Sequence, residues 1–136
     1  MPEHEGACKA FHGHRYAAEI TCAAPSLDSL GRIIDFGVVK SIVGGWIYRT
    51  WDHTAILMAS DPDPAVQHIV ASNERHGRPV YLMAAPPTAE NIAAELATVS
   101  RQLLQGTGIA VVMVRVWETP NCSATWFAEE GPRPPL

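Results

Sequence analysis

The residues best suited to chemistry in this sequence are two histidines near its start, in the segment His12-Gly13-His14. Residues two apart on an extended strand share one face and lie about 6–7 Å apart at Cα, so both imidazoles can reach one tetrahedral metal ion. Zinc normally takes a third protein ligand and keeps a fourth position for substrate or water. The pattern indicates a metal site, and its alternative is a polar pair on the surface at a strand end.

A cysteine precedes this pair. Cys8 lies four residues before His12, in a segment with Gly6 that is typical of a loop. A thiol beside a divalent cation loses its proton more easily and can serve as a base or a nucleophile. The alternative is a free cysteine that packs as a small buried hydrophobic residue. The residues alone leave both interpretations open.

Two acidic residues, Asp52 and Glu118, are also candidates for a functional site. Asp52 directly precedes His53, and a carboxylate can orient a histidine and raise its basicity. The alternative for this pair is a solvated loop. Glu118 ends a strongly apolar segment, where an acid is costly unless it meets a ligand or a hydrogen-bonding partner. Such a carboxylate can accept two hydrogen bonds from the amino-pyrimidinone edge of a pterin or purine, and the alternative is an acid in water.

The hydrophobic pattern predicts the elements that position these residues. Residues 12–22 alternate with period two, which is typical of a strand that carries both histidines on one face. Residues 34–49 repeat at helical spacing, and Asp35 is available as the N-cap. Further along the chain we expect a helix at 65–74 and strands at 78–83, 109–118 and 123–127.

A third helix has the clearest signal. Thr88 is its expected N-cap. Its apolar stripe consists of Ile92, Leu96, Val99 and Leu103, which step by four, three and four residues. The strand expected at 109–118 is β-branched and almost continuously apolar, as a central strand covered on both faces would be. The order of elements predicts an α+β layered fold in which strands pair mostly as hairpins and helices cover one face.

Composition sets limits on the class of protein. The chain has 136 residues, of which 47% are hydrophobic, so we expect one domain over residues 1–128 and a flexible tail at 129–136. The net charge of −4 predicts no nucleic-acid or anionic-lipid partner. No apolar run is long enough for a membrane span, and the start does not resemble a signal peptide. Three widely spaced cysteines, Cys8, Cys22 and Cys122, favour a reducing compartment, and we expect a cytoplasmic protein.

Five short motifs occur in order along the chain. They are C-x3-HGH at 8–14, IIDF at 33–36, DH at 52–53, PTAEN at 87–91 and ET at 118–119. Together they resemble the family of 6-pyruvoyltetrahydropterin synthase and 6-carboxytetrahydropterin synthase, over roughly residues 8–126. The three-residue gap between Cys8 and His12 resembles the bacterial 6-carboxy enzymes of queuosine (7-deazaguanine) biosynthesis.

The resemblance implies a tunnelling fold, in which an antiparallel sheet backed by helices assembles with copies of itself into a β-barrel. Such assemblies are often homohexamers, with active sites between subunits. It also implies a zinc ion (Zn2+) held by three histidines, of which His12 and His14 would be two. The substrate would be 7,8-dihydroneopterin triphosphate, converted to 6-carboxy-5,6,7,8-tetrahydropterin with loss of acetaldehyde and triphosphate.

The resemblance assigns the remaining site residues as well. Cys8 would accept the proton, with Asp52, His53 and Glu118 as its relay. Glu118 would also anchor the pterin, and Thr88 would contact it. Two related functions stay open as alternatives: 6-pyruvoyltetrahydropterin synthase, and a pterin- or purine-binding relative without turnover. A general zinc hydrolase is disfavoured because no HExxH motif occurs.

One part of the family pattern differs here. The family's third zinc histidine lies on a strand upstream of the HGH, in a segment such as FxAAH, which this sequence does not contain. We expect that strand to be missing through a late start or truncation. Alternatively, His4 takes the place of the missing histidine, or the metal is lost in a non-catalytic relative.

Overall fold

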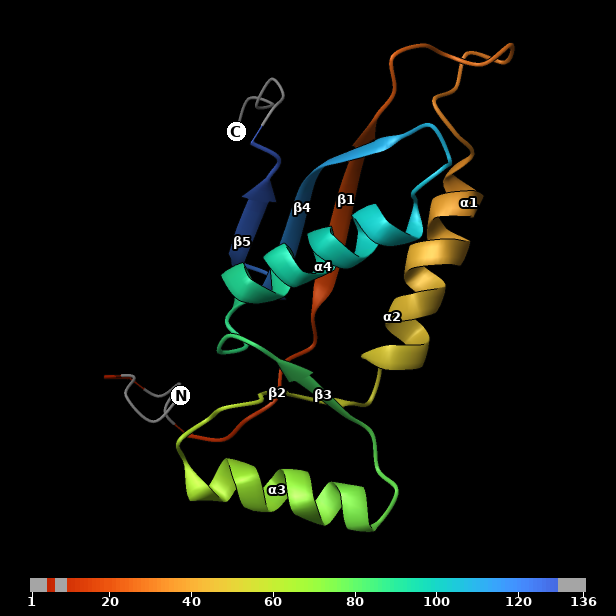
Figure 1. Ribbon diagram of the computed structural model, residues 1–136. Helices are drawn as coiled ribbons and strands as arrows, with labels where there is room; N and C mark the ends of the chain where they lie inside the picture. The colour runs from red at the N-terminus through yellow and green to blue at the C-terminus, as the bar shows by residue number, and fades with distance from the viewer. Residues whose placement is uncertain (1–4, 7–9, 130–136) are drawn as a thin grey trace.

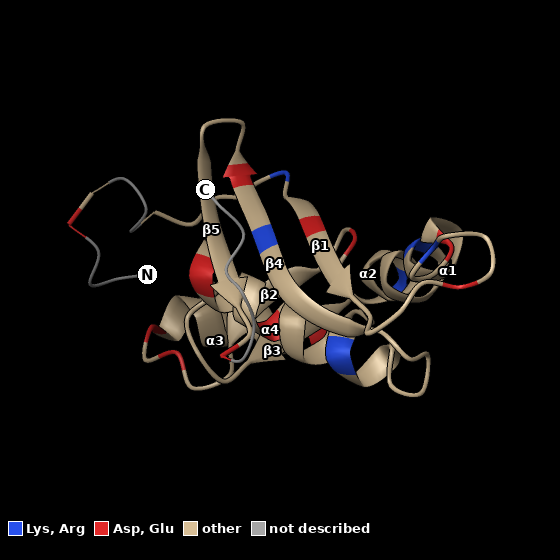
Figure 2. Ribbon diagram, turned by 90° about the horizontal axis from the view of Figure 1, so that it is seen from above, with Lys and Arg blue, Asp and Glu red and all other residues tan. Residues whose placement is uncertain are grey.

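A three-stranded antiparallel sheet with helices on one side forms the main part of the protein (Figures 1 and 2). The structure is a computed structural model that describes residues 5–6 and 10–129. Its elements are β1 (Ala17–Ala23), α1 (Phe36–Val39), a π-helical segment (Lys40–Gly44), α2 (Gly45–Thr50), β2 (Ala55–Met58), α3 (Pro64–Arg75), β3 (Val80–Met83), α4 (Ala89–Leu103), β4 (Ala110–Thr119) and β5 (Cys122–Phe127). The expected α+β class is confirmed.

Strand β4 lies in the centre of this sheet, as its apolar sequence predicts. It pairs antiparallel with β1 on one side and with β5 on the other. On the β1 side Thr21 lies opposite Met113 and Cys22 opposite Val111, so one residue of β4 bulges out of the ladder. Side chains alternate between faces along a strand, and the bulge resets this alternation. It lets Val111 point into the same core as Val114.

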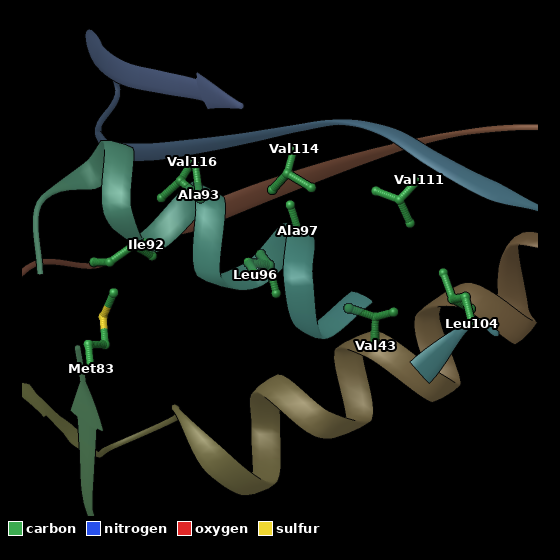
Figure 3. Close-up of a cluster of buried hydrophobic side chains, with 10 residues drawn as sticks. All are labelled: Val43, Met83, Ile92, Ala93, Leu96, Ala97, Leu104, Val111, Val114 and Val116. Carbon is green, nitrogen blue, oxygen red and sulfur yellow. The ribbon is translucent and has the colours of Figure 1, made fainter. Parts of the chain in front are cut away.

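Helix α4 covers β4 and supplies much of the core (Figure 3). The core residues are Val43, Met83, Ile92, Ala93, Leu96, Ala97, Leu104, Val111, Val114 and Val116. Ile92 and Leu96 confirm the start of the predicted stripe. Val99 is half-buried, and the prediction is wrong at Leu103, which is 36% exposed while Leu104 is buried instead. The buried face is rotated toward Ala93 and Ala97, whose small side chains let the helix approach the sheet closely.

The first helical region runs without a break from Phe36 to Thr50 and contains a π-helical segment. Asp35 caps it as predicted, because its carboxylate accepts a hydrogen bond of 2.7 Å from the backbone N–H of Gly37. The π-helical turn over Lys40–Gly44 was not expected from the helical spacing. It adds one residue to a turn while the helix continues on either side.

A second, smaller sheet consists of two parallel strands. β2 and β3 pair in parallel, which differs from the expected mainly hairpin arrangement. Helix α3 makes the crossover between them and has no fully buried residue; Figure 1 shows it at the far end of the molecule from the three-stranded sheet. Strand β2 has only four residues, too few for a hydrophobic period to predict it. No described helix is long and apolar enough to cross a membrane.

Truncation of the central core side chain tests this packing. Leu96 is 1% exposed, so Leu96→Ala is expected to lower the free energy of unfolding by about 2–5 kcal/mol, through lost burial and the cavity left behind. The measurement is urea unfolding followed by circular dichroism. Gln102→Ala, at an exposed position of the same helix, is the control and should change stability by less than about 0.5 kcal/mol. Equal effects of the two substitutions would contradict the packing described here.

Candidate active site

The two histidines of the HGH segment face each other directly. Nε2 of His12 lies 2.8 Å from Nε2 of His14, which confirms that the spacing brings the imidazoles together. The expected strand is wrong at this end, because β1 begins only at Ala17. Ala17 lies opposite Trp117, and β4 ends two residues beyond it. The segment before Ala17 therefore has little of β4 left to pair with.

A backbone contact determines which nitrogen of His12 carries a proton. Nδ1 of His12 lies 2.7 Å from the carbonyl oxygen of Ala10. A carbonyl can only accept, so Nδ1 donates, and Nε2 of the neutral ring carries a lone pair and no proton. That lone pair accepts a hydrogen bond of 2.8 Å from Nε2 of His14. A backbone hydrogen bond to the far nitrogen is the usual way in which a protein orients a metal-binding histidine.

Glu118 lies beside this histidine pair, near the end of β4. Its Oε1 is 3.5 Å from Nε2 of His14. The β1–β4 register explains the contact, because it brings the segment before Ala17 alongside the end of β4. The side chains of His14 and Glu118 are only 23% and 30% exposed. The acid is therefore partnered, which favours the interpretation of Glu118 as a site residue over an acid in free solvent.

Tyr16 belongs to the same cluster and was assigned no role from the sequence. Burial raises the pKa of its hydroxyl to about 12, and the charge of Glu118 and a hydrogen bond to that carboxylate act in the same direction. Its ring also contacts that of His14, with ring centroids 5.9 Å apart. The only signal in the sequence was its period-two spacing from His14. The hydroxyl stays protonated at neutral pH and donates to Glu118.

Asp52 and His53 form a second pair, in the turn between α2 and β2. Oδ2 of Asp52 lies 3.0 Å from Nδ1 of His53, so the carboxylate does orient the imidazole, as the sequence suggested. The His53 side chain is 91% exposed, and its backbone has a φ of 55°. Left-handed backbone is uncommon for a residue with a Cβ and often marks a functional turn. Among the described residues, no ion pair joins this dyad to His14 or Glu118.

Thr88 caps α4, as expected. Its hydroxyl accepts a hydrogen bond of 3.3 Å from the backbone N–H of Asn91. A contact with a pterin stays a prediction. Cys8 and His4 lie outside the described residues.

The histidine pair suits a metal ion. Zinc–nitrogen bonds are about 2.0–2.1 Å long, so two nitrogens 2.8 Å apart can both reach one ion. The described residues contain no group of three metal-binding side chains. Two imidazoles are one side chain fewer than the three protein ligands that zinc normally takes.

The fold and the site together define an α+β protein with a histidine and glutamate site at one end of its central strand. The sequence matches the model of the family described as 6-pyruvoyl tetrahydropterin synthase over residues 1–129. The chain belongs to this family, which makes it an enzyme of the pterin-synthase lyases. Family membership also implies the tunnelling fold.

Several similar proteins are named for a more specific activity than that of the family. A protein of Rickettsia bellii named 6-carboxy-5,6,7,8-tetrahydropterin synthase is 39% identical over 121 residues, which cover 88% of this chain and 84% of the relative. A protein of Bacillus subtilis with the same name is 29% identical over 129 residues, or 95% of this chain and 76% of the relative. The crystal structure of an uncharacterized protein from Wolinella succinogenes shares the fold, with a TM-score of 0.77 at 23% identity over 90% of this chain and 82% of that one.

The contact between Tyr16 and Glu118 can be tested by titration. Glu118→Gln removes the negative charge, so the pKa of Tyr16 is expected to fall from about 12 toward its ordinary value of about 10. Phenolate absorbance gives the measurement, with a Tyr16→Phe protein subtracted to isolate this tyrosine. Glu129→Gln, at an exposed position, is the control. An unchanged titration in Glu118→Gln would show that the carboxylate does not act on Tyr16.

The raised pKa of Tyr16 also makes the free energy of unfolding depend on pH. Because the folded-state pKa of Tyr16 lies above the unfolded value, its contribution is complete below about pH 10 and is lost as the pH rises through about 12. The wild-type protein should therefore lose more stability than Tyr16→Phe over this alkaline range.

Proposed function

We propose that this protein is a zinc-dependent 6-carboxy-5,6,7,8-tetrahydropterin synthase. It converts 7,8-dihydroneopterin triphosphate and releases acetaldehyde and triphosphate, as a cytoplasmic step of queuosine (7-deazaguanine) biosynthesis. The observation that carries the proposal is the pair of facing histidines, 2.8 Å apart at Nε2, with Glu118 beside them. The relatives named as this synthase at 29–39% identity support it.

His12 and His14 would hold the zinc ion through their Nε2 atoms. When bound, the ion polarises the oxygens of the substrate side chain and lowers the cost of moving protons between that side chain and the ring. The backbone carbonyl of Ala10 keeps the proton of His12 on Nδ1, so that Nε2 remains available. Among the described residues, no third metal-binding side chain joins them.

Glu118 would anchor the pterin. A carboxylate offers about four acceptor positions, and His14 and Tyr16 use only part of this capacity. The remaining lone pairs can accept hydrogen bonds from the amino group and a ring N–H of the pterin, which orients the ring beside the histidine pair. Thr88 would add a contact at the start of α4.

Proton transfer would involve residues from separate parts of the chain. Cys8 would accept the proton, with Asp52, His53 and Glu118 as its relay. The oriented imidazole of His53 is well exposed, so a second subunit can reach it. We propose that the dyad of one subunit completes the site of a neighbouring one.

The form of the three-stranded sheet supports such an assembly. Helices lie on one side of the sheet (Figure 2). In the described part of the chain, β1 and β5 are its unpaired edges. Unpaired edges readily join strands of another chain. We propose a homohexamer in which these sheets form a β-barrel.

Product analysis tests the proposed reaction. Purified protein with zinc and 7,8-dihydroneopterin triphosphate is expected to yield 6-carboxy-5,6,7,8-tetrahydropterin and acetaldehyde, identified by mass spectrometry. Cys8→Ala should reduce turnover by at least about a hundredfold, since it removes the proton acceptor. Cys122→Ala, at an exposed cysteine, is the matched control and should be fully active.

Other products would favour the alternatives. Retention of the side chain as a pyruvoyl group would indicate 6-pyruvoyltetrahydropterin synthase. Binding without any product would indicate a pterin- or purine-binding relative.

Metal content tests the proposed ligands. His14→Ala removes one of the two facing nitrogens, so zinc affinity is expected to fall by more than about tenfold. Zinc per chain is measured by elemental analysis after dialysis against a buffered zinc concentration. His68→Ala, on the exposed surface of α3, is the control. Equal zinc contents of wild type and His14→Ala would remove this histidine from the ligand set.

A further inference from the structure

A tyrosine and a glutamate link β3 to α4. The hydroxyl of Tyr81 donates a hydrogen bond of 2.5 Å to Oε1 of Glu95. Burial raises the pKa of Tyr81 to about 12, and the hydrogen bond and charge of Glu95 act in the same direction. The hydroxyl therefore stays protonated, and the bond persists at the pH values at which an enzyme works.

This bond spans the loop that carries Thr88. Residues 84–88 connect β3 to α4, and Tyr81 and Glu95 lie on either side of them in the sequence. A hollow of about 170 Å³ lies beside the loop, lined by Ala84, Ala85 and Glu95 among others. Side-chain packing therefore does not fill the space between this part of the loop and α4. The Tyr81–Glu95 hydrogen bond joins β3, which ends just before the loop, to α4, which begins just after it.

The same tyrosine contacts the turn that carries Asp52 and His53. The rings of Trp51 and Tyr81 pack edge to face with centroids 5.5 Å apart, and Trp51 also packs on Trp46 at 5.0 Å. Trp51 immediately precedes Asp52. Because the two residues are adjacent, the packing of Trp51 in this cluster also restricts the position of Asp52.

The backbone of His53 has an unfavourable conformation, so the turn must be held in place by its surroundings. His53 has a φ of 55°, which a residue with a Cβ adopts only when its surroundings impose it. The turn is closed by a hydrogen bond of 3.1 Å from the N–H of Thr54 to the carbonyl of Trp51. Trp51 is therefore both the start of the strained turn and the part of it that is packed into the aromatic cluster.

We propose that Trp51, Tyr81 and Glu95 are positioning residues that hold the Asp52–His53 turn and the Thr88 loop in a fixed relation to each other. The inference rests on the proposed function, in which the dyad relays protons and Thr88 contacts the pterin. The three residues act through these two segments. A misplacement of about 1 Å at a catalytic group can cost a hundredfold in rate.

Steady-state kinetics of three variants test the proposal. Tyr81→Phe removes the donor and keeps the ring, and Glu95→Ala removes the acceptor. Each is expected to lower kcat by about tenfold, through the dyad, and to raise KM for the pterin triphosphate, through Thr88. Glu95→Gln keeps an acceptor oxygen and should restore most of both parameters. Tyr48→Phe, at a tyrosine that is 73% exposed, is the control and should behave as wild type.

Hydrogen exchange separates the positioning role from a purely structural one. In Tyr81→Phe and Glu95→Ala, amides of residues 52–54 and 84–88 should exchange faster, while those of β4 keep their wild-type rates. Unchanged kinetics, unchanged exchange in both segments, or faster exchange throughout β4 would each overturn the proposal. If the wild type does not turn over the pterin triphosphate, the proposed function fails, and exchange in the two segments still decides whether the three residues position them.

Discussion

The packing of α4 against β4 is the contact on which the rest of the structure depends. Ala93 and Ala97 let the helix lie close to the sheet, and Leu96 is buried in the same cluster as Val114 of β4 and Val43 of the first helical region (Figure 3). Burial of a large aliphatic side chain contributes about 1.5–3 kcal/mol, so a few such residues account for much of a small domain's stability. Because β4 is held in this way, the acid near its end has a defined position.

The register of β1 against β4 connects this core to the site. Ala17 lies opposite Trp117, and the segment just before Ala17 therefore meets Glu118. A slip of one residue would turn each side chain of β1 to the other face of the sheet, which would separate His14 from the carboxylate. The core residues of β1 and β4 thus determine the geometry of a site to which they contribute no polar group.

Much of this arrangement could be predicted from the sequence, because its signals are local. The N-caps Asp35 and Thr88 and the apolar strand β4 are examples. The facing of His12 and His14 was predicted for the wrong reason, since it arises in irregular backbone. Tyr16 was missed because its partnership with Glu118 depends on pairing across nearly the whole chain. The parallel pairing of β2 and β3 was missed since both strands are short and distant in sequence.

The π-helical segment affects how the length of this helical region can change during evolution. A π-helical turn holds one residue more than the corresponding α-helical turn, so loss of one residue within Lys40–Gly44 would restore regular α-helix and leave the helix on either side in place. Trp46 and Trp51 would then keep their contacts with Tyr81, and the turn of Asp52 would keep its position. Related proteins can therefore differ in length by one residue at this point without compensating changes in the aromatic residues that follow.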